Sequence, residues 1–228
     1  AATNETLGAW SLARGHSNIN VTAGAGGANL TFGSFATNFP QNGATVRFSG
    51  TNLGLAAGAN NATIKGNITF AGQTGAAGAT TKGILPWALA ENTTAGTFGF
   101  ATADSATGVI RLLTAAEKLT TTTLTANVNQ ELSGAAVSAA SVSINSLSLL
   151  SGGGVTLTNA FPNYPVLTIQ SGGILAMAGN NGITGGVVLA SANSGTSVRP
   201  LYVHALGDLN INSVLLGVRG LARISHTS

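Results

Sequence analysis

The acidic side chains are the first candidates for catalysis, because the chain has so few of them. The six carboxylates are Glu5, Glu91, Asp104, Glu117, Glu131 and Asp208. Glycoside hydrolysis needs two carboxylates within about 5–10 Å of each other, and a calcium-dependent site needs an acidic cluster. Only Glu91, Asp104 and Glu117 are placed so that they could meet. We expect solvated loop and cap residues instead, and we therefore predict no catalytic residue.

Trp87 is the main aromatic candidate for binding. An exposed tryptophan can act as a platform for a sugar ring, but a lone tryptophan beside Pro86 is more often a packing residue. We expect packing. Trp87, Glu91 and Asp104 are kept as weak candidates for ligand binding.

His204 and Asp208 lie four residues apart and, with a serine, would have the residue types of a hydrolytic triad. The G-x-S-x-G turn that presents the serine of many such enzymes is absent. We therefore expect a histidine at a strand end and an aspartate in a turn, each with local hydrogen bonds. No His pair or acidic cluster has the spacing of metal ligands, so neither a metal nor a cofactor is predicted.

The composition excludes several other classes of function. Charged residues make up 7% of the chain, against about 25% in an average protein. The net charge is only +3 and the cations are scattered, whereas nucleic-acid binding needs dense basic patches. The absence of cysteine removes disulfides and thiolate zinc sites. The sequence contains no run of 18 apolar residues, which is the signal of a membrane-spanning helix. We therefore expect no membrane contact within this segment.

Short runs of alternating apolar and polar residues recur from one end of the chain to the other, which is the pattern of half-buried strands. Clusters of Gly, Asn and Ser separate them, as expected for turns. The runs are 19–21, 29–32, 45–48, 63–70, 142–149, 155–157, 166–169, 173–177, 187–189, 201–204 and 209–211.

Two all-β architectures accept strands at this spacing, an antiparallel sandwich and a parallel β-solenoid. The low aromatic content (5%) and the small, uniform side chains favour the solenoid. In such a stack, Asn or Thr side chains can satisfy their hydrogen bonds along the ladder. We predict a right-handed parallel β-helix with about 20–25 residues per coil, forming one domain over residues 1–228 of a longer chain.

One stretch departs from the repeating pattern. Residues 82–118 combine Pro86 and Trp87 with three of the six acids. Thr114-Ala115-Ala116-Glu117 has the Thr-x-x-Glu form of a helix cap. We predict a looped excursion over about 82–118 that ends in one short helical turn and whose apolar side chains cover the solenoid.

The same stretch resembles a known family. Its pieces are Lys82-Gly83-Ile84-Leu85-Pro86-Trp87-Ala88, then Phe98-Gly99-Phe100-Ala101-Thr102, then Gly108-Val109-Ile110-Arg111-Leu112-Leu113-Thr114-Ala115-Ala116-Glu117. They are similar to the pattern G-I-L-P-W-A, F-A-T-Y-D and G-V-R-x-L-T-x-x-E-Y of autotransporter-associated β-strand repeat surface proteins of Verrucomicrobia and Planctomycetes. Ala103 stands where that family tends to have Tyr.

This resemblance implies a parallel β-helix, export to the cell surface or secretion, attachment to the outer membrane through a C-terminal part outside this segment, and no catalysis. We therefore expect a structural passenger segment, acting as a stalk or adhesin-like display rod. Its expected partners are the rest of its own passenger chain and surface glycans or neighbouring cells. The alternative is a glycan-binding or polysaccharide-active β-helix.

Overall fold

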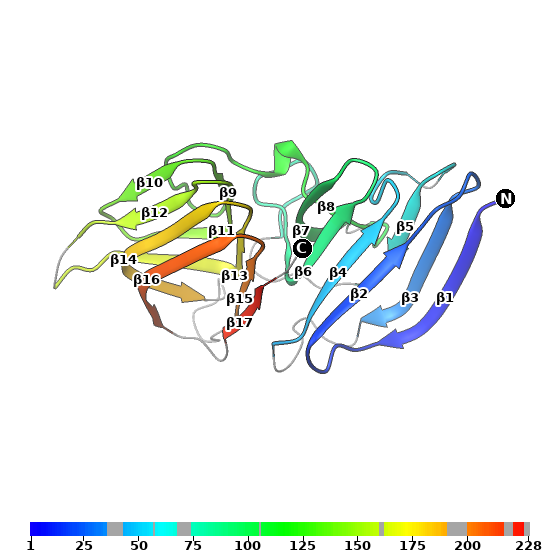
Figure 1. The fold of residues 1–228 in the computed structure, drawn as a ribbon, viewed down its shortest axis with the longest axis horizontal. Helices are drawn as coiled ribbons and strands as arrows, with labels where there is room; N and C mark the ends of the chain where they lie inside the picture. The colour runs from blue at the N-terminus through cyan, green and yellow to red at the C-terminus, as the bar shows by residue number, and fades with distance from the viewer. Residues whose placement is uncertain are drawn as a thin grey trace. The chain divides into compact units, whose positions relative to one another are not determined.

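The computed structural model describes residues 1–35, 43–56, 58–67, 74–104, 106–159, 162–190, 200–216 and 221–225. The prediction of an all-β protein is confirmed, with extensive parallel sheets (Figure 1). No helix among these residues is long and apolar enough to cross a membrane. The chain separates into two compact units, described in turn below.

Unit 1 comprises Ala1–Phe70 and Trp87–Leu113, and unit 2 comprises Ala71–Pro86 and Thr114–Ser228. The sequence had predicted a single solenoid segment without this division. One of the three points at which the chain passes between the units lies inside a strand, between Pro86 and Trp87.

Among the described residues, unit 1 holds eight strands in two sheets, and the chain alternates between these sheets from β1 to β6. They are β1 (Thr3–Trp10), β2 (His16–Val21), β3 (Ala28–Phe35), β4 (Thr45–Gly50), β5 (Ala62–Lys65), β6 (Leu85–Asn92), β7 (Thr97–Ala103) and β8 (Ile110–Leu112). Strands β1, β3 and β5 form one parallel sheet. Strands β2, β4 and β6 are also parallel, and that sheet continues through β7 to β8, with β7 and β8 antiparallel.

The core of unit 1 is built around aromatic side chains. The rings of Trp10 and Phe32 stack with centroids 5.2 Å apart, and Trp10 meets Phe48 edge-on at 6.1 Å. Phe48 and Ile64 are fully buried. Burial of large apolar groups such as these is the main favourable term for folding.

Residues 82–118 do not form a looped excursion, and the sequence prediction is wrong there. Strands β6, β7 and β8 lie within the stretch and are members of the five-stranded sheet. The first six residues of β6 are all buried, so the strand has no polar face and shows no alternation that would reveal it. The predicted helical turn is confirmed as a 3-10 turn at Ala115–Glu117.

Unit 2 holds nine strands in one sheet. They are β9 (Asn129–Leu132), β10 (Ala135–Ser138), β11 (Val142–Leu149), β12 (Gly154–Leu157), β13 (Val166–Ala176), β14 (Asn180–Ala190), β15 (Leu201–Ala205), β16 (Asp208–Leu216) and β17 (Leu221–Ser225). Among the described residues, the strands of this sheet pair in parallel.

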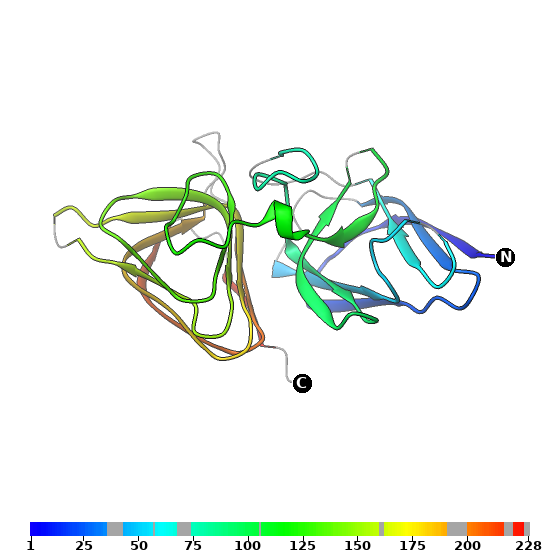
Figure 2. The same ribbon diagram turned by 90° about the horizontal axis from the view of Figure 1, so that it is seen from above.

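The register of these pairings divides unit 2 into three ladders that the chain visits in a constant order. The first ladder contains β9, the second half of β11, the second half of β13, β15 and β17. The second contains β10, β12 and the first halves of β14 and β16. The third contains the first halves of β11 and β13 and the second halves of β14 and β16. Figure 2 shows strands of this unit overlying one another.

The long strands bend where they pass from one ladder to the next. In β13 the bend lies at Gly172, which has a φ of +83°. A Cβ atom at this position would collide with the carbonyl oxygen of Pro200 on the next coil. Glycine is therefore required here both by the positive φ and by the close approach of the neighbouring backbone.

Inward-pointing side chains of the three ladders form a continuous apolar core. Fully buried members come from neighbouring coils, among them Ile144, Leu167, Ile169, Ile174 and Ile183. Strands of neighbouring ladders thus cover one another's apolar side chains, and burial of this kind is the main favourable term for folding.

Candidate functional site

Trp87 is a packing residue in the structure. It lies in β6 of unit 1 and its side chain is 2% exposed. A sugar ring cannot stack on an indole that other side chains already cover, so this residue is unsuited to act as a binding platform.

Glu91 lies in β6 and forms an ion pair with Arg47 of the neighbouring strand β4. The two side chains are 21% and 33% exposed, respectively. The guanidinium of Arg47 also lies over the ring of Phe98, 5.6 Å from its centroid. The prediction that Glu91 lies on a solvated loop is therefore wrong, because it is a strand residue held by a specific cation.

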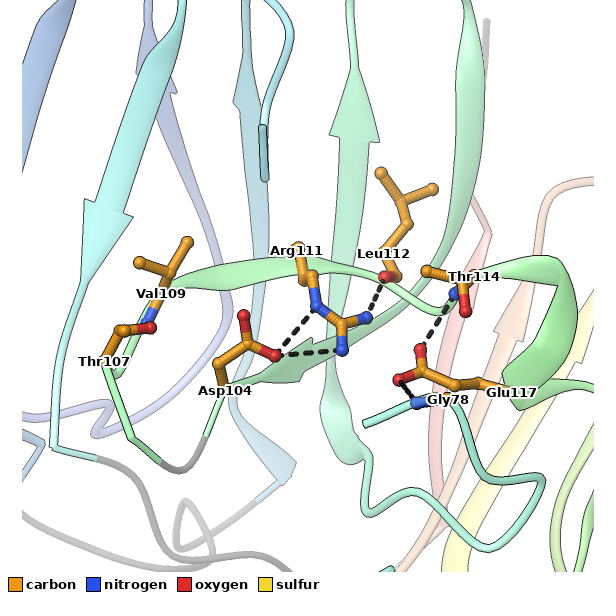
Figure 3. A network of polar contacts seen from close by, with 8 residues as sticks. All are labelled: Gly78, Asp104, Thr107, Val109, Arg111, Leu112, Thr114 and Glu117. Carbon is orange, nitrogen blue, oxygen red and sulfur yellow. Dashed lines mark hydrogen bonds and ion pairs between the residues drawn. The ribbon is translucent and has the colours of Figure 1, made fainter. Parts of the chain in front are cut away.

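Asp104 directly follows β7, at the turn that leads to β8, and it is paired rather than freely solvated. Its Oδ1 accepts hydrogen bonds from Nε of Arg111 at 3.0 Å and from Nη2 of the same guanidinium at 2.9 Å. A third nitrogen, Nη1, donates to the carbonyl of Leu112 at 2.8 Å (Figure 3). A fork of this kind fixes the orientation of both side chains.

The turn that carries Asp104 forms backbone hydrogen bonds with the end of β5. Lys65 and Val109 form an antiparallel bridge, and the amide of Gly66 donates to the carbonyl of Gly108 at 3.0 Å. Gly108 has a φ of +66°, and a Cβ there would lie 2.6 Å from the oxygen of Gly66. This contact brings the β7–β8 turn against strands that are distant in sequence.

A cavity of about 360 Å³ lies at this junction in unit 1. The middle of β3, the end of β5 and the β7–β8 turn line it, with polar side chains from Thr31, Lys65, Asn67, Asp104 and Thr107. Thr31 and Lys65 are partners in the β3–β5 register. Of the three residues that the sequence identified as binding candidates, Asp104 alone lines this cavity.

Glu117, grouped with Glu91 and Asp104 on sequence grounds, belongs to unit 2 and has a separate structural role. It is fully buried. Its Oε1 accepts a bond from the amide of Gly78 and its Oε2 from the amide of Thr114, both at 2.9 Å (Figure 3). The expectation that it caps the helical turn is confirmed by the second bond.

His204 and Asp208 do not form the beginnings of a triad. His204 is buried within β15 and its Nε2–H donates to the carbonyl of Pro86 at 2.8 Å. Asp208 is exposed at the start of β16. The expected local bond for His204 is therefore replaced by one across a large sequence separation.

His16 lies in β2, and its Nδ1 is 2.9 Å from the hydroxyl of Thr45. Partial burial and the nearby charge of Arg47 lower the pKa of this imidazole. Across the described ranges, no group of three or more His, Asp or Glu side chains is arranged to hold a metal ion. His226 lies outside the described residues.

A buried polar network in unit 2 was not identified from the sequence. Asn129 Nδ2 donates to the carbonyls of Lys82 at 2.8 Å and Glu117 at 3.1 Å. Its Oδ1 accepts from Asn145 at 2.7 Å and from Ser146 at 2.8 Å. All five residues are at most 3% exposed. The sequence feature that could have indicated this network is the pair of polar residues Asn145-Ser146 inside an alternating apolar run.

Comparison with known proteins gives no relative. No family model, no curated protein and no solved structure matches this chain.

Proposed function

We propose that this chain is a structural segment of a surface-displayed or secreted protein similar to the autotransporter-associated β-strand repeat proteins. In this proposal the segment is a right-handed parallel β-helix that serves as a stalk or adhesin-like display rod. Its partners are the rest of its own passenger chain and, at the cell surface, glycans or neighbouring cells.

The observation that carries the proposal is the constant order of the three ladders in unit 2. A residue and its partner on the next coil are separated by 25 positions for Val142 and Leu167, and by 29 for Gly173 and Tyr202. A chain that returns to the same ladder at such intervals is a coiled stack. This arrangement supports a β-helix over a sandwich, in which neighbouring strands are mostly antiparallel.

The stiffness of such a stack suits a mechanical role. Every coil shares backbone hydrogen bonds and a continuous apolar core with its neighbours, so stiffness requires neither metal ions nor disulfides. The chain contains no cysteine and therefore no disulfide. The polar ladder from Asn129 through Asn145 adds side-chain bonds between coils.

The acidic residues also support a structural role. Glu91 and Asp104 each pair with a different arginine, and Glu117 accepts backbone hydrogen bonds inside unit 2. We propose that these carboxylates organise the fold and that the segment is not an enzyme.

Antibody labelling of intact cells tests the proposed location. An antibody raised against this segment should label unpermeabilised cells of the producing bacterium, and brief external proteolysis should remove the signal. A cytoplasmic protein serves as the control and should stay unlabelled. Labelling that appears only after permeabilisation would contradict surface display.

A crystal structure tests the fold part of the proposal separately. Successive coils should wind with the right hand, as almost all crossovers between parallel strands do. Coils of the opposite hand, or an antiparallel sandwich, would exclude the proposed β-helix.

A further inference from the structure

The cavity in unit 1 is lined by polar groups that can contact a ligand. Its volume of about 360 Å³ lies at the lower end of the range for small-molecule pockets, about 300–1,000 Å³. Its lining combines the polar side chains named above with the apolar Phe32, Ala103 and Ala106. Such a mixture fits a small ligand that has both polar and apolar faces.

Lys65 provides a cation in this cavity. No hydrogen bond or ion pair of its amine is found among the described residues, and its side chain is half-buried at the end of β5. A partly desolvated ammonium gains more from an anionic partner than a fully hydrated one does.

Asp104 provides an acceptor. Both contacts that Arg111 makes with Asp104 end on Oδ1, and no described residue donates a hydrogen bond to Oδ2, so Oδ2 can accept from a ligand hydroxyl. The guanidinium compensates the charge of this carboxylate, and the charge of Lys65 therefore stays without a counterpart in the cavity. The hydroxyls of Thr31 and Thr107 add groups that can both donate and accept.

We propose that this cavity binds a sugar that bears a carboxylate, such as a uronic acid unit of an acidic glycan. The ligand carboxylate pairs with Lys65, and a ring hydroxyl donates to Oδ2 of Asp104. The apolar face of the ring packs beside Ala106, the exposed apolar residue of the lining. This inference depends on the cavity alone, and it holds or fails independently of the proposed stalk function.

Titration calorimetry of the whole chain with methyl galacturonide and methyl galactoside tests the proposal. The two sugars differ in the carboxylate, so the galacturonide should bind at least about tenfold more tightly, and the difference should shrink as salt is raised. Equal affinity for the two sugars, or no binding of either, would overturn the proposal. Acetate at the same concentration should compete poorly, and competition as effective as that of the galacturonide would show a simple anion site and exclude the sugar.

Variants of Lys65 and Asp104 test which residue contributes to the binding of each sugar. Lys65→Gln should abolish the preference for galacturonide, and Lys65→Arg should retain it. Asp104→Asn should weaken the binding of both sugars, because an amide offers a poorer acceptor for the hydroxyl. Arg14→Gln is the matched control, because it removes an exposed cation that does not line the cavity. Each variant is first compared with the parent chain by thermal unfolding, and a galacturonide preference that persists in folded Lys65→Gln would refute the role of Lys65.

Discussion

The imidazole of His204 donates a hydrogen bond to the backbone carbonyl of Pro86 at 2.8 Å, although 118 residues separate them in sequence. His204 is fully buried in β15, and Pro86 lies in the part of β6 that belongs to the same unit. A carbonyl can only accept, so Nε2 must carry the proton. This bond ties the first residues of β6 to a late coil of unit 2.

Replacing His204 tests how much this bond contributes to stability. His204→Val should lower the free energy of unfolding by about 1–3 kcal/mol, because the buried carbonyl of Pro86 then has no donor at this position. His204→Gln keeps a side-chain donor and should cost less. Urea unfolding followed by circular dichroism measures both changes, and equal losses would argue against a role for the donor.

Trp87→Ala should destabilise the protein by about 3–5 kcal/mol, since the side chain is 2% exposed and its removal leaves a large void. Trp87→Phe fills part of that space and should cost less. The free energy of unfolding from denaturant titration is the measurement. A loss below about 1 kcal/mol for the alanine variant would show that the ring is not a core residue.

The pair of Arg47 and Glu91 is partly exposed, so its contribution to stability should be modest. A double-mutant cycle with Arg47→Met and Glu91→Gln should give a coupling energy of about 0.2–1 kcal/mol that decreases with added salt. A coupling well above this range, or one insensitive to salt, would contradict the interpretation as a screened surface pair.

Asn129→Ala should be among the most damaging polar substitutions in unit 2. It removes two donated and two accepted hydrogen bonds inside the core. Leaving buried polar groups without partners should cost about 2–4 kcal/mol in total. Asn210→Ala, on the exposed face of β16, is the control and should change stability by less than about 0.5 kcal/mol. Similar losses in both variants would contradict the special role of the buried network.

Alkaline pH should destabilise the fold through Tyr202. Burial raises the pKa of this phenol from 10.0 to about 12. A raised folded-state pKa means that the stabilising contribution is complete below pH 10 and is lost as the pH rises from about 10 to about 12. The loss approaches roughly 3 kcal/mol, at 1.36 kcal/mol for each unit of the pKa difference.

The pH dependence can be assigned with two substitutions. The chain has two tyrosines, so a Tyr164→Phe background leaves Tyr202 as the sole source of the tyrosinate absorbance. Tyr202→Phe should remove the alkaline loss of stability. Persistence of the full loss in that variant would show that another group causes it.

Much of the strand pattern could be predicted from local residue order. The run at 142–149 coincides with β11, and the runs near 155–157, 166–169 and 201–204 lie in β12, β13 and β15. In β12 buried and more exposed residues alternate, so the period-two pattern marks this strand. The helical turn at Ala115–Glu117 was also predictable, because its cap uses residues only three positions apart.

Local residue order is enough to predict that this protein is built from short strands and turns, since period-two alternation and the glycines between the runs are local properties of the chain. Tertiary structure alone decided that β6 is a buried strand, that Asp104 pairs with Arg111 beside the cavity, and that Asn129 meets the carbonyl of Lys82. The physical reason is that pairing between strands depends on which distant residues the coils bring into register. Neither composition nor periodicity records those partners, because a buried strand has no polar face and an ion pair has no fixed spacing in sequence.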